Sequence, residues 1–173
     1  MSRKIVHVIG TGTIGEPLIG LLCDFKNELG IDDVTFHKHT PLTTDRSKVK
    51  SLVKRGARLT SHEEKIDGFN NIGLKVEFTA DAALDRASVV IDCTPKGFGH
   101  ENKKKYYEHH LNNTLGFIAQ GSEFGFGKPY ARGVNDETLI SGEDRFIQVV
   151  SCNTHNLSAI VKTIALDEDP NNL

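Results

Sequence analysis

The turn at residues 10–15 constrains the fold of this chain more than any other feature. It follows a short apolar run at residues 5–9, and it opens a segment at residues 13–29 whose apolar residues have helical spacing. Its residues fit the pattern G-x-G-x-x-G and are Gly10, Thr11, Gly12, Thr13, Ile14 and Gly15. Between a strand and a helix, these glycines permit a tight turn, close approach of a pyrophosphate and close helix packing. The sequence therefore predicts a dinucleotide site here, the alternative being a simple tight turn.

Strands and helices alternate along the rest of the chain. We expect further strands at residues 34–37, 75–78, 88–93, 116–120 and 146–150. We expect helices around residues 49–53 and at 81–87, 100–110 and 152–166, with a glycine-rich loop at 121–133 and a frayed polar tail at 167–173. This alternation predicts an α/β fold of Rossmann type, a doubly wound and mostly parallel sheet that is covered on both faces.

Composition narrows the class of protein. The length of 173 residues suits one domain of ordinary size. Hydrophobic residues make up 38% and the formal net charge is -2, which argues against disorder and against a nucleic-acid partner. The sequence contains no apolar run of membrane-spanning length, so we expect no membrane association. Three cysteines without close pairing indicate a reducing compartment, and we expect a cytoplasmic protein.

The end of the second predicted strand bears on cofactor choice. NAD-selective enzymes often carry an acidic residue there for the ribose hydroxyls, whereas residues 36–40 contain no carboxylate. Lys38 is suited to hold a 2′-phosphate, and the alternative is a solvated basic loop. We therefore expect NADP or NAD as cofactor.

Cys152 stands where a predicted buried strand gives way to a helix, at the edge where open α/β folds bind ligands. The helix dipole favours a thiolate at such a position, which suits a nucleophile that attacks an aldehyde. The alternative is a structural cysteine that is capped by Ser151 and Asn153. Cys23 and Cys93 lie among apolar residues, and we interpret both as small core residues.

Histidines raise the question of a metal. His37 and His39 lie close together, as do His109 and His110. Adjacent histidines on a helix point apart, and no cysteine or carboxylate set completes a site, so we predict no metal. His155 is interpreted as a polar residue on an exposed first helical turn rather than as a base.

Several segments resemble one family in order and spacing, the type II (archaeal-type) glyceraldehyde-3-phosphate dehydrogenases. The run V-S-C-N-T at residues 150–154 is similar to their active-site segment, and the turn at residues 10–15 to their glycine turn. Residues 36–41 resemble the family's basic loop, residues 92–99 its D-x-T-P-x-G-x-G turn and residues 120–123 its Q-G-G-E segment. The resemblance extends from Lys4 to Leu166.

The resemblance implies an NAD(P)-dependent, phosphorylating dehydrogenase of glycolysis that acts on a phosphorylated aldehyde and forms homo-oligomers. Cys152 would be the acyl-forming nucleophile, and Asn153 and Thr154 would position substrate or phosphate. The residues that would contact the nicotinamide dinucleotide are Gly10, Thr11, Gly12, Thr13, Ile14 and Gly15 at the pyrophosphate, Lys38 at the adenosine ribose, Thr94, Pro95 and Gly97 at the cleft edge, and Gln120 and Gly121 near the nicotinamide.

The sequence departs from the family after Thr154. The family commonly continues T-G-L-C-R, whereas residues 155–159 are H-N-L-S-A. From the resemblance we also expect the family's catalytic domain, with its histidine base, to lie outside these 173 residues. We expect a Rossmann domain at residues 1–151, and a nucleophile-bearing helix and tail at residues 152–173 at the boundary to that domain. Alternatives are a related semialdehyde dehydrogenase and a non-catalytic nucleotide-binding or redox-sensing module.

Overall fold

The computed structural model describes residues 3–166 and confirms the Rossmann-type α/β fold. Within these residues, eight strands form one sheet in the order β4-β3-β2-β1-β5-β6-β8-β7, and every neighbouring pair is parallel. The strands are β1 (Ile5–Ile9), β2 (Asp33–His37), β3 (Arg58–Ser61), β4 (Phe78–Thr79), β5 (Val89–Asp92), β6 (Gly116–Ala119), β7 (Lys128–Tyr130) and β8 (Phe146–Val149). The chain builds outward from β1 in both directions, so the strand order reverses between β1 and β5.

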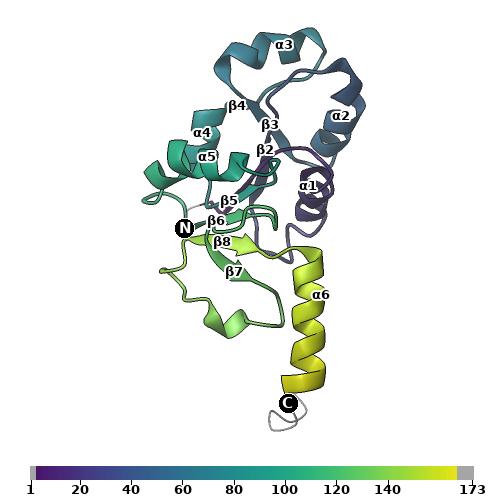
Figure 1. Cartoon of the computed structure of the whole chain (residues 1–173). Coiled ribbons are helices and arrows are strands. Elements are labelled where there is room, and N and C mark those ends of the chain that lie inside the picture. Colours follow the sequence, from purple (N-terminus) through teal and green to yellow (C-terminus); the bar gives the residue numbers. More distant parts are fainter. Residues whose placement is uncertain (1–2, 167–173) are drawn as a thin grey trace.

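Helices cover both faces of this sheet. They are α1 (Gly15–Asp24), α2 (Arg46–Lys54), α3 (Ile66–Asn71), α4 (Ala80–Arg86), α5 (Phe98–Lys105) and α6 (Cys152–Val161). Short 3-10 turns occur at Thr43–Asp45, Glu63–Lys65, Tyr107–His109 and Asp136–Thr138, and a π-helical turn at Lys162–Leu166. Helices α1 and α2 lie on one side of the sheet, and α4 and α5 lie on the other (Figure 1). This arrangement is the doubly wound one that the alternating pattern predicts.

Each face of the sheet has its own apolar core. Val8, Phe36 and Leu59, from β1, β2 and β3, are fully buried against α1 and α2. On the opposite side, Val90 of β5 and Phe117 of β6 pack with apolar residues of the α4 and α5 layer, namely Leu84, Ala87, Tyr107 and Phe126. Strand β5 directs apolar side chains to both faces, since Val89 and Ile91 pack against the first core and Val90 lies in the second.

The three strands β1, β2 and β3 differ from this on the α4 side. There they present His7, Thr35, His37 and Thr60, which we call the polar face. The register pairs His7 with Thr35 and His37 with Thr60, and side chains alternate along a strand, so the four residues share one face. His7 Nδ1 lies 2.7 Å from Thr35 Oγ1. The polar face is thus buried, and it extends toward the carboxyl ends of these strands.

The structure corrects several element boundaries. Strand β3 and helix α3 were not predicted, because residues 58–61 carry a single large apolar side chain and residues 66–71 form a short segment in which Ile66 and Phe69 are the only apolar side chains. The strand predicted at residues 75–78 shortens to β4, and the glycine-rich loop contains β7. Helix α1 ends at Asp24, and turns at residues 25–30 close on Gly30, whose φ is +63°. Leu21, Phe25 and Leu29, which belong to the apolar residues with helical spacing, are about half exposed.

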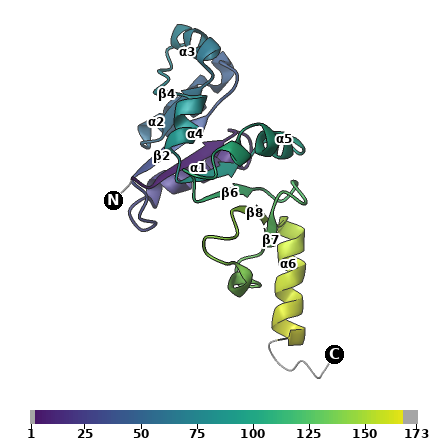
Figure 2. The ribbon, with the colours of Figure 1, turned by 90° about the vertical axis from the view of Figure 1, so that its left-hand side faces the viewer.

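Helix α6 extends away from the sheet, as Figures 1 and 2 show from two directions. Its outward apolar side chains are exposed, with 66% of Leu157 and 70% of Ile164 accessible. Lys162 Nζ donates to the carbonyls of Gly133 and Val134 at 3.0 and 3.2 Å, which fixes α6 to the loop after β7. The polar tail predicted at residues 167–173 lies outside the described residues. Within residues 3–166 no helix is both long enough and apolar enough to cross a membrane.

The unpredicted strand β3 is expected to be essential for stability. Leu59 is fully buried in the core beneath α2, so Leu59→Ala should lower the free energy of unfolding by about 2–5 kcal/mol. The matched control is Leu21→Ala, at a site that is 53% exposed, and it should change stability by about 0.5 kcal/mol or less. Urea unfolding measures both values, and equal transition midpoints for the two variants would contradict the core assignment.

Candidate functional site

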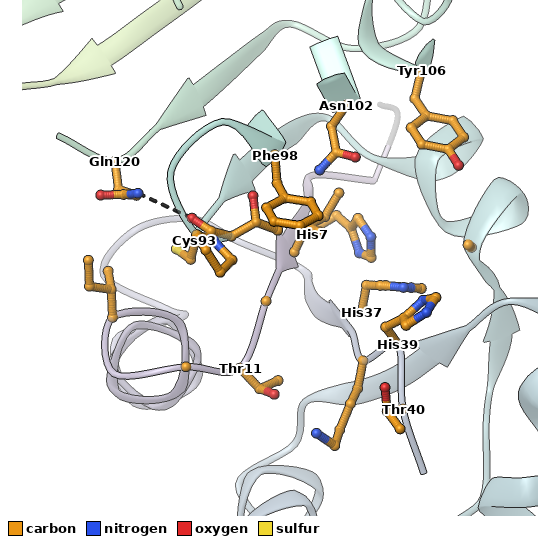
Figure 3. A pocket seen from close by; sticks show the side chains of 18 of the residues that line it. His7, Thr11, His37, His39, Thr40, Cys93, Phe98, Asn102, Tyr106 and Gln120 are labelled. Carbon is orange, nitrogen blue, oxygen red and sulfur yellow. Dashed lines mark hydrogen bonds between the residues drawn. The ribbon is translucent and has the colours of Figure 1, made fainter. Parts of the chain in front are cut away.

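A cavity of about 920 Å³ lies at the carboxyl edge of the sheet, where the strand order reverses. We call it the central cavity. It is lined by residues that follow β1, β2, β3, β5 and β6, together with the facing surfaces of α4 and α5. In Figure 3, Gln120 and Cys93 lie toward one end of this cavity, and His7, His37 and His39 lie toward the other. Open α/β sheets bind ligands in a crevice of this kind.

The sequence predicted many of the lining residues. Predicted residues that line the cavity are Gly10, Thr11, Gly12, Thr13, Ile14, Lys38, Thr94, Pro95 and Gln120. Predicted residues that lie outside the lining are Gly15, Gly97, Gly121, Cys152, Asn153 and Thr154. The first group brings four separate loops together around one space. In the second group, the three glycines belong to the segments that carry lining residues, whereas Cys152, Asn153 and Thr154 lie at the start of α6.

The three glycines of the turn have different local surroundings. Gly10 has a φ of +96°, and a Cβ there would lie 2.9 Å from the carbonyl oxygen of Cys93. A Cβ on Gly15 would lie 2.0 Å from the carbonyl oxygen of Gly10, which leaves no room for a side chain. A Cβ on Gly12 would meet no atom within 4 Å. Gly10 and Gly15 are therefore required by the fold, whereas Gly12 keeps open the space above the turn.

Helix α1 begins directly behind this turn. Its N-cap residue, Ile14, provides no side-chain hydrogen bond to the first helical turn. The first N–H groups of a helix lack partners within the helix and carry the positive end of its dipole. In α1 the N–H of Glu16 already donates to the carbonyl of Gly12 at 3.1 Å and Pro17 has no N–H, so the helix dipole is the feature that favours an anion there.

A buried carboxylate shapes the turn after β5. Asp92 is 1% exposed, and its Oδ1 accepts from the backbone N–H of Thr94 at 2.9 Å and from the Thr94 hydroxyl. Its Oδ2 accepts from Asn102 Nδ2 at 2.9 Å and from the Tyr107 hydroxyl. Burial, followed by the charge of Asp92, raises the pKa of Tyr107 well above its usual value. These bonds hold Thr94 and Pro95 at the edge of the cavity.

A second buried carboxylate, Glu123, secures the start of α5. It is 1% exposed and accepts from the N–H groups of Gly97 at 2.6 Å and His100 at 3.2 Å. Gly97 has a φ of +92°, so its role is to let the backbone turn toward Glu123. The sequence did not predict the partners of Asp92 or Glu123. The sequence signals for these contacts were that Asp92 is a lone acidic residue at the end of a buried strand and that Glu123 is one in a glycine-containing loop.

Lys38 lies at the predicted position, but its charge has a partner. Its side chain is 10% exposed, and Nζ donates to Asp45 Oδ2 at 2.6 Å. The hydrogen bond from Lys38 lowers the pKa of Asp45, so the carboxylate is ionised near neutral pH. The sequence argument found no carboxylate in residues 36–40 and missed Asp45, which reaches Lys38 from the turn before α2. This ion pair bears directly on the choice between the two dinucleotides.

Three histidines meet beside Lys38. The ring of His62 lies 4.8 Å from that of His37 and 5.4 Å from that of His39, measured between centroids. Burial, together with the nearby His62 and His39, lowers the pKa of His37 to about 4. The prediction of no metal assumed that no third ligand accompanies His37 and His39. His62 supplies that third imidazole, and it was missed because β3, which carries it to this edge, was missed.

The three cysteines have different environments. Cys93 is buried and Cys23 half-buried, as the sequence predicts for core residues. Burial, with the nearby charge of Asp92, raises the pKa of Cys93 to about 12, and burial also raises that of Cys23. Cys152 is exposed on the first turn of α6, with its Sγ 4.0 Å from Asn153 Oδ1. Cys152 is therefore the accessible thiol among the three.

The start of α6 is fixed by local contacts. Ser151 caps the helix, since its Oγ accepts from the N–H of Thr154 at 3.2 Å and lies 2.9 Å from the Thr154 hydroxyl. A Cβ on Gly121 would lie 2.6 Å from Ser151 Cα, so the loop that carries Gln120 touches the backbone next to Cys152. His155 is engaged elsewhere, with its Nε2 2.9 Å from the carbonyl oxygen of Arg132. This contact gives His155 a structural partner.

Several curated proteins that match the chain carry the name glyceraldehyde-3-phosphate dehydrogenase. The protein from Methanobacterium bryantii is 32% identical over 166 residues, which are 93% of this chain and 45% of that protein. The Methanothermus fervidus protein is 29% identical over 168 residues, with the same coverage of both chains. The Pyrobaculum islandicum protein is 26% identical over 166 residues, which are 94% of this chain and 44% of that protein. The chain thus spans about half the length of these relatives.

Two further comparisons add little. No family model matches the chain. Among solved structures, an imine reductase from Pseudomonas sp. aligns with 68% of this chain and 32% of its own, with 18% identity and a TM-score of 0.37. The pyruvate reductase of Chlamydomonas reinhardtii aligns with 69% of this chain and 26% of its own, with 14% identity and a TM-score of 0.30. The resemblance inferred from the motifs is nevertheless confirmed by the curated relatives: this chain is related to the archaeal glyceraldehyde-3-phosphate dehydrogenases and corresponds to their N-terminal part.

Proposed function

We propose that this chain binds NADP or NAD and forms the dinucleotide-binding part of a phosphorylating glyceraldehyde-3-phosphate dehydrogenase. The observation that carries the proposal is the central cavity, which opens at the reversal of strand order and has residues 10–14 of the glycine turn, directly before α1, in its wall. The names of the curated relatives support the same class of oxidoreductase.

The cavity fits an extended dinucleotide in one direction. The pyrophosphate belongs above Gly12, where a Cβ would meet no atom within 4 Å, beside the positive end of the α1 dipole. The adenosine ribose belongs at the end of β2, beside Lys38, and the nicotinamide belongs toward Gln120 and Thr94. Gln120 Nε2 donates to the carbonyl oxygen of Thr94 at 3.2 Å, which joins the two loops at that end (Figure 3).

The proposed chemistry starts at Cys152. Its thiolate adds to the carbonyl carbon of the aldehyde, forming a carbon–sulfur bond and a hemithioacetal whose oxygen takes the electron pair. A bound nicotinamide supplies the two-electron acceptor for the hydride of that carbon. The resulting thioester is cleaved by inorganic phosphate, which releases an acyl phosphate and returns the thiolate. Asn153 and Thr154 flank the thiol and are placed to orient the substrate or the phosphate.

The division into domains is part of the proposal. Residues 1–151 form the dinucleotide-binding domain, and residues 152–173 carry the nucleophile toward a further catalytic domain. Two observations support this: α6 exposes Leu157, Ile160 and Val161 and the π-helical turn after it exposes Ile164, and the curated relatives are about twice as long as the chain. The phosphorylated aldehyde and a homo-oligomeric assembly belong to that longer enzyme. Alone, the chain should bind dinucleotide and turn over poorly.

The glycine turn provides the first test. Gly12→Ala should leave stability nearly unchanged, since its Cβ meets no protein atom, yet weaken dinucleotide binding by about tenfold or more because it fills the pyrophosphate path. Gly15→Ala is the matched control, and it should destabilise the chain by about 1–3 kcal/mol or more through its clash with Gly10. Calorimetric titration and urea unfolding give the two readouts. Unchanged dinucleotide affinity in a folded Gly12→Ala chain would exclude this path for the pyrophosphate.

The Lys38–Asp45 ion pair provides a test of cofactor choice. If Lys38 contacts a 2′-phosphate, Lys38→Ala should weaken the binding of NADP by about tenfold and the binding of NAD by less. Asp45→Asn removes the competing carboxylate and should strengthen NADP relative to NAD. Lys48→Ala, which removes a neighbouring cation paired with Glu16, serves as the control for general charge effects. Equal losses of affinity for NADP and for NAD in Lys38→Ala would mean that the lysine does not select between them.

The accessible thiol can be tested by alkylation. With iodoacetamide at pH 8, Cys152 should be modified first and Cys93 last, because Cys93 is buried and its pKa is raised to about 12. Mass spectrometry of the peptides gives the order, and Cys152→Ser should remove the fast phase. Faster modification of Cys93 than of Cys152 would argue against Cys152 as the nucleophile.

A further inference from the structure

The alternation of side chains along β2 and β3 brings three histidines to one place. His37 ends β2, and His39 follows two residues later, so both belong to the same side of the sheet. His37 pairs in register with Thr60 of β3, and His62 stands two residues beyond Thr60. His39 and His62 lie beyond the ends of β2 and β3, and extending the register by two residues sets His62 opposite His39. The fold itself, not a chance surface contact, places the three imidazoles together.

The distances within this set are short. One ring nitrogen from each of His37, His39 and His62 can be chosen so that the three atoms lie within 4.8 Å of one another. His37 is buried, His62 half-buried and His39 exposed, so the set extends from the interior of the sheet edge to solvent. All three side chains line the central cavity, and Figure 3 shows His37 and His39 side by side within it. An ion from solvent therefore has access to the set.

His37 also carries an unsatisfied polar atom. Its Nδ1 is buried and has no hydrogen-bond partner within the described part of the chain. A buried polar atom without a partner costs about 1–3 kcal/mol, so such atoms call for an explanation. The neighbouring His7 differs in this respect, because its Nδ1 is already used by the Thr35 hydroxyl at 2.7 Å. His7 is also not among the described residues whose ligand atoms lie within 4.8 Å of one another.

We propose that His37, His39 and His62 bind one Zn²⁺ ion, with a fourth coordination position open toward the central cavity. Imidazole nitrogen is a preferred ligand of Zn²⁺, and three histidines with one open position are an established form of zinc site. The nearby positive charge of Lys38 does not oppose the ion, because Asp45 offsets it at 2.6 Å.

The geometry needs only a local adjustment. Tetrahedral Zn–N bonds of about 2.0–2.1 Å place the nitrogen atoms roughly 3.4 Å apart, so the imidazoles must approach one another by on the order of 1.5 Å. His39 and His62 both lie just beyond the ends of their strands, where side-chain rotation leaves the strand hydrogen bonds intact. His37, held within β2, is the fixed ligand toward which the other two move.

The test measures metal directly and needs no dinucleotide, so its failure is distinct from a failure of the proposed function. The chain in a Cys152→Ser background, which removes the exposed thiol as a competing ligand, is stripped with a chelator and titrated with ZnCl₂ by calorimetry. CoCl₂ is added in a parallel experiment, and its visible absorption reports tetrahedral coordination. We expect one ion per chain and an intense tetrahedral Co²⁺ band.

Variants identify the ligands. His62→Ala and His39→Ala should each weaken Zn²⁺ by about a hundredfold or more, since even outer partners of a metal ligand contribute about 10–100-fold. The control is His109→Ala, which removes an exposed histidine from the other close pair and should leave affinity unchanged. Thermal unfolding followed by circular dichroism verifies that each variant is folded.

Two results would overturn the proposal. The first is equal Zn²⁺ affinity in His62→Ala and its parent, which would place the ion elsewhere. The second is an absence of Zn²⁺ binding to the folded chain, and inorganic phosphate is titrated in the same experiment to see whether it binds instead and whether His62→Ala abolishes that binding. Phosphate binding that His62→Ala abolishes would make the three histidines an anion site rather than a metal site.

Discussion

The parallel pairing of β1 with both β2 and β5 is the constraint on which the rest of the structure depends. Residues 5–9 of β1 pair with residues 33–37 on one side, and residues 6–9 pair with residues 89–92 on the other. Because the following connections run to opposite faces of the sheet, a crevice opens at the carboxyl end of β1. Gly10 fits there only because it lacks a Cβ, which would press on the carbonyl of Cys93. The cavity, the glycine turn and the start of α1 all follow from this one arrangement.

Burial of polar groups beside that crevice is the main cost of the arrangement. His7 and His37 are buried side by side, and burial lowers their pKa values to about 3 and about 4. Both rings are therefore neutral near pH 7, which limits the electrostatic penalty. The Thr35 hydroxyl satisfies His7, whereas the Nδ1 of His37 has no partner in the described residues. An apolar core would contain no such atom. The polar face, which borders the central cavity, is therefore suited to bind a ligand.

Much of the fold could be predicted because its signals are local. Residues 5–9 and 88–93 are apolar runs next to glycine or proline, so β1 and β5 were found within one or two residues. Strand β3 was not predicted because Leu59 is its single large apolar residue. Thr60 and Ser61 are buried by tertiary contacts, which no local sequence pattern reveals. The site divides in the same way. The turn at residues 10–15 is a contiguous motif, whereas Asp45 and His62 become neighbours of Lys38 and His37 only through strand pairing.

The loop after β6 shows how the backbone couples the cavity to α6. At one end, Gly121 lies so close to Ser151 that a Cβ would come within 2.6 Å of Ser151 Cα, and at the other, a Cβ on Gly127 would come within 2.1 Å of the carbonyl of Phe146. Between them, Gln148 Nε2 donates to the carbonyl of Gly121 at 3.2 Å, and its Oε1 accepts from the N–H of Gly125 at 3.3 Å.

The same loop carries Gln120 into the cavity and directs Glu123 to the N–H groups at the start of α5. Its position is thus set by close backbone contacts with β8 and the residue before α6, which side-chain rotation cannot relax. Any shift of α6, whose first residue is Cys152, must therefore move Gln120 as well. The accessible thiol and the far end of the cavity are held in a fixed relation by the backbone, as a reaction between a thiol-bound group and a cavity-bound cofactor requires.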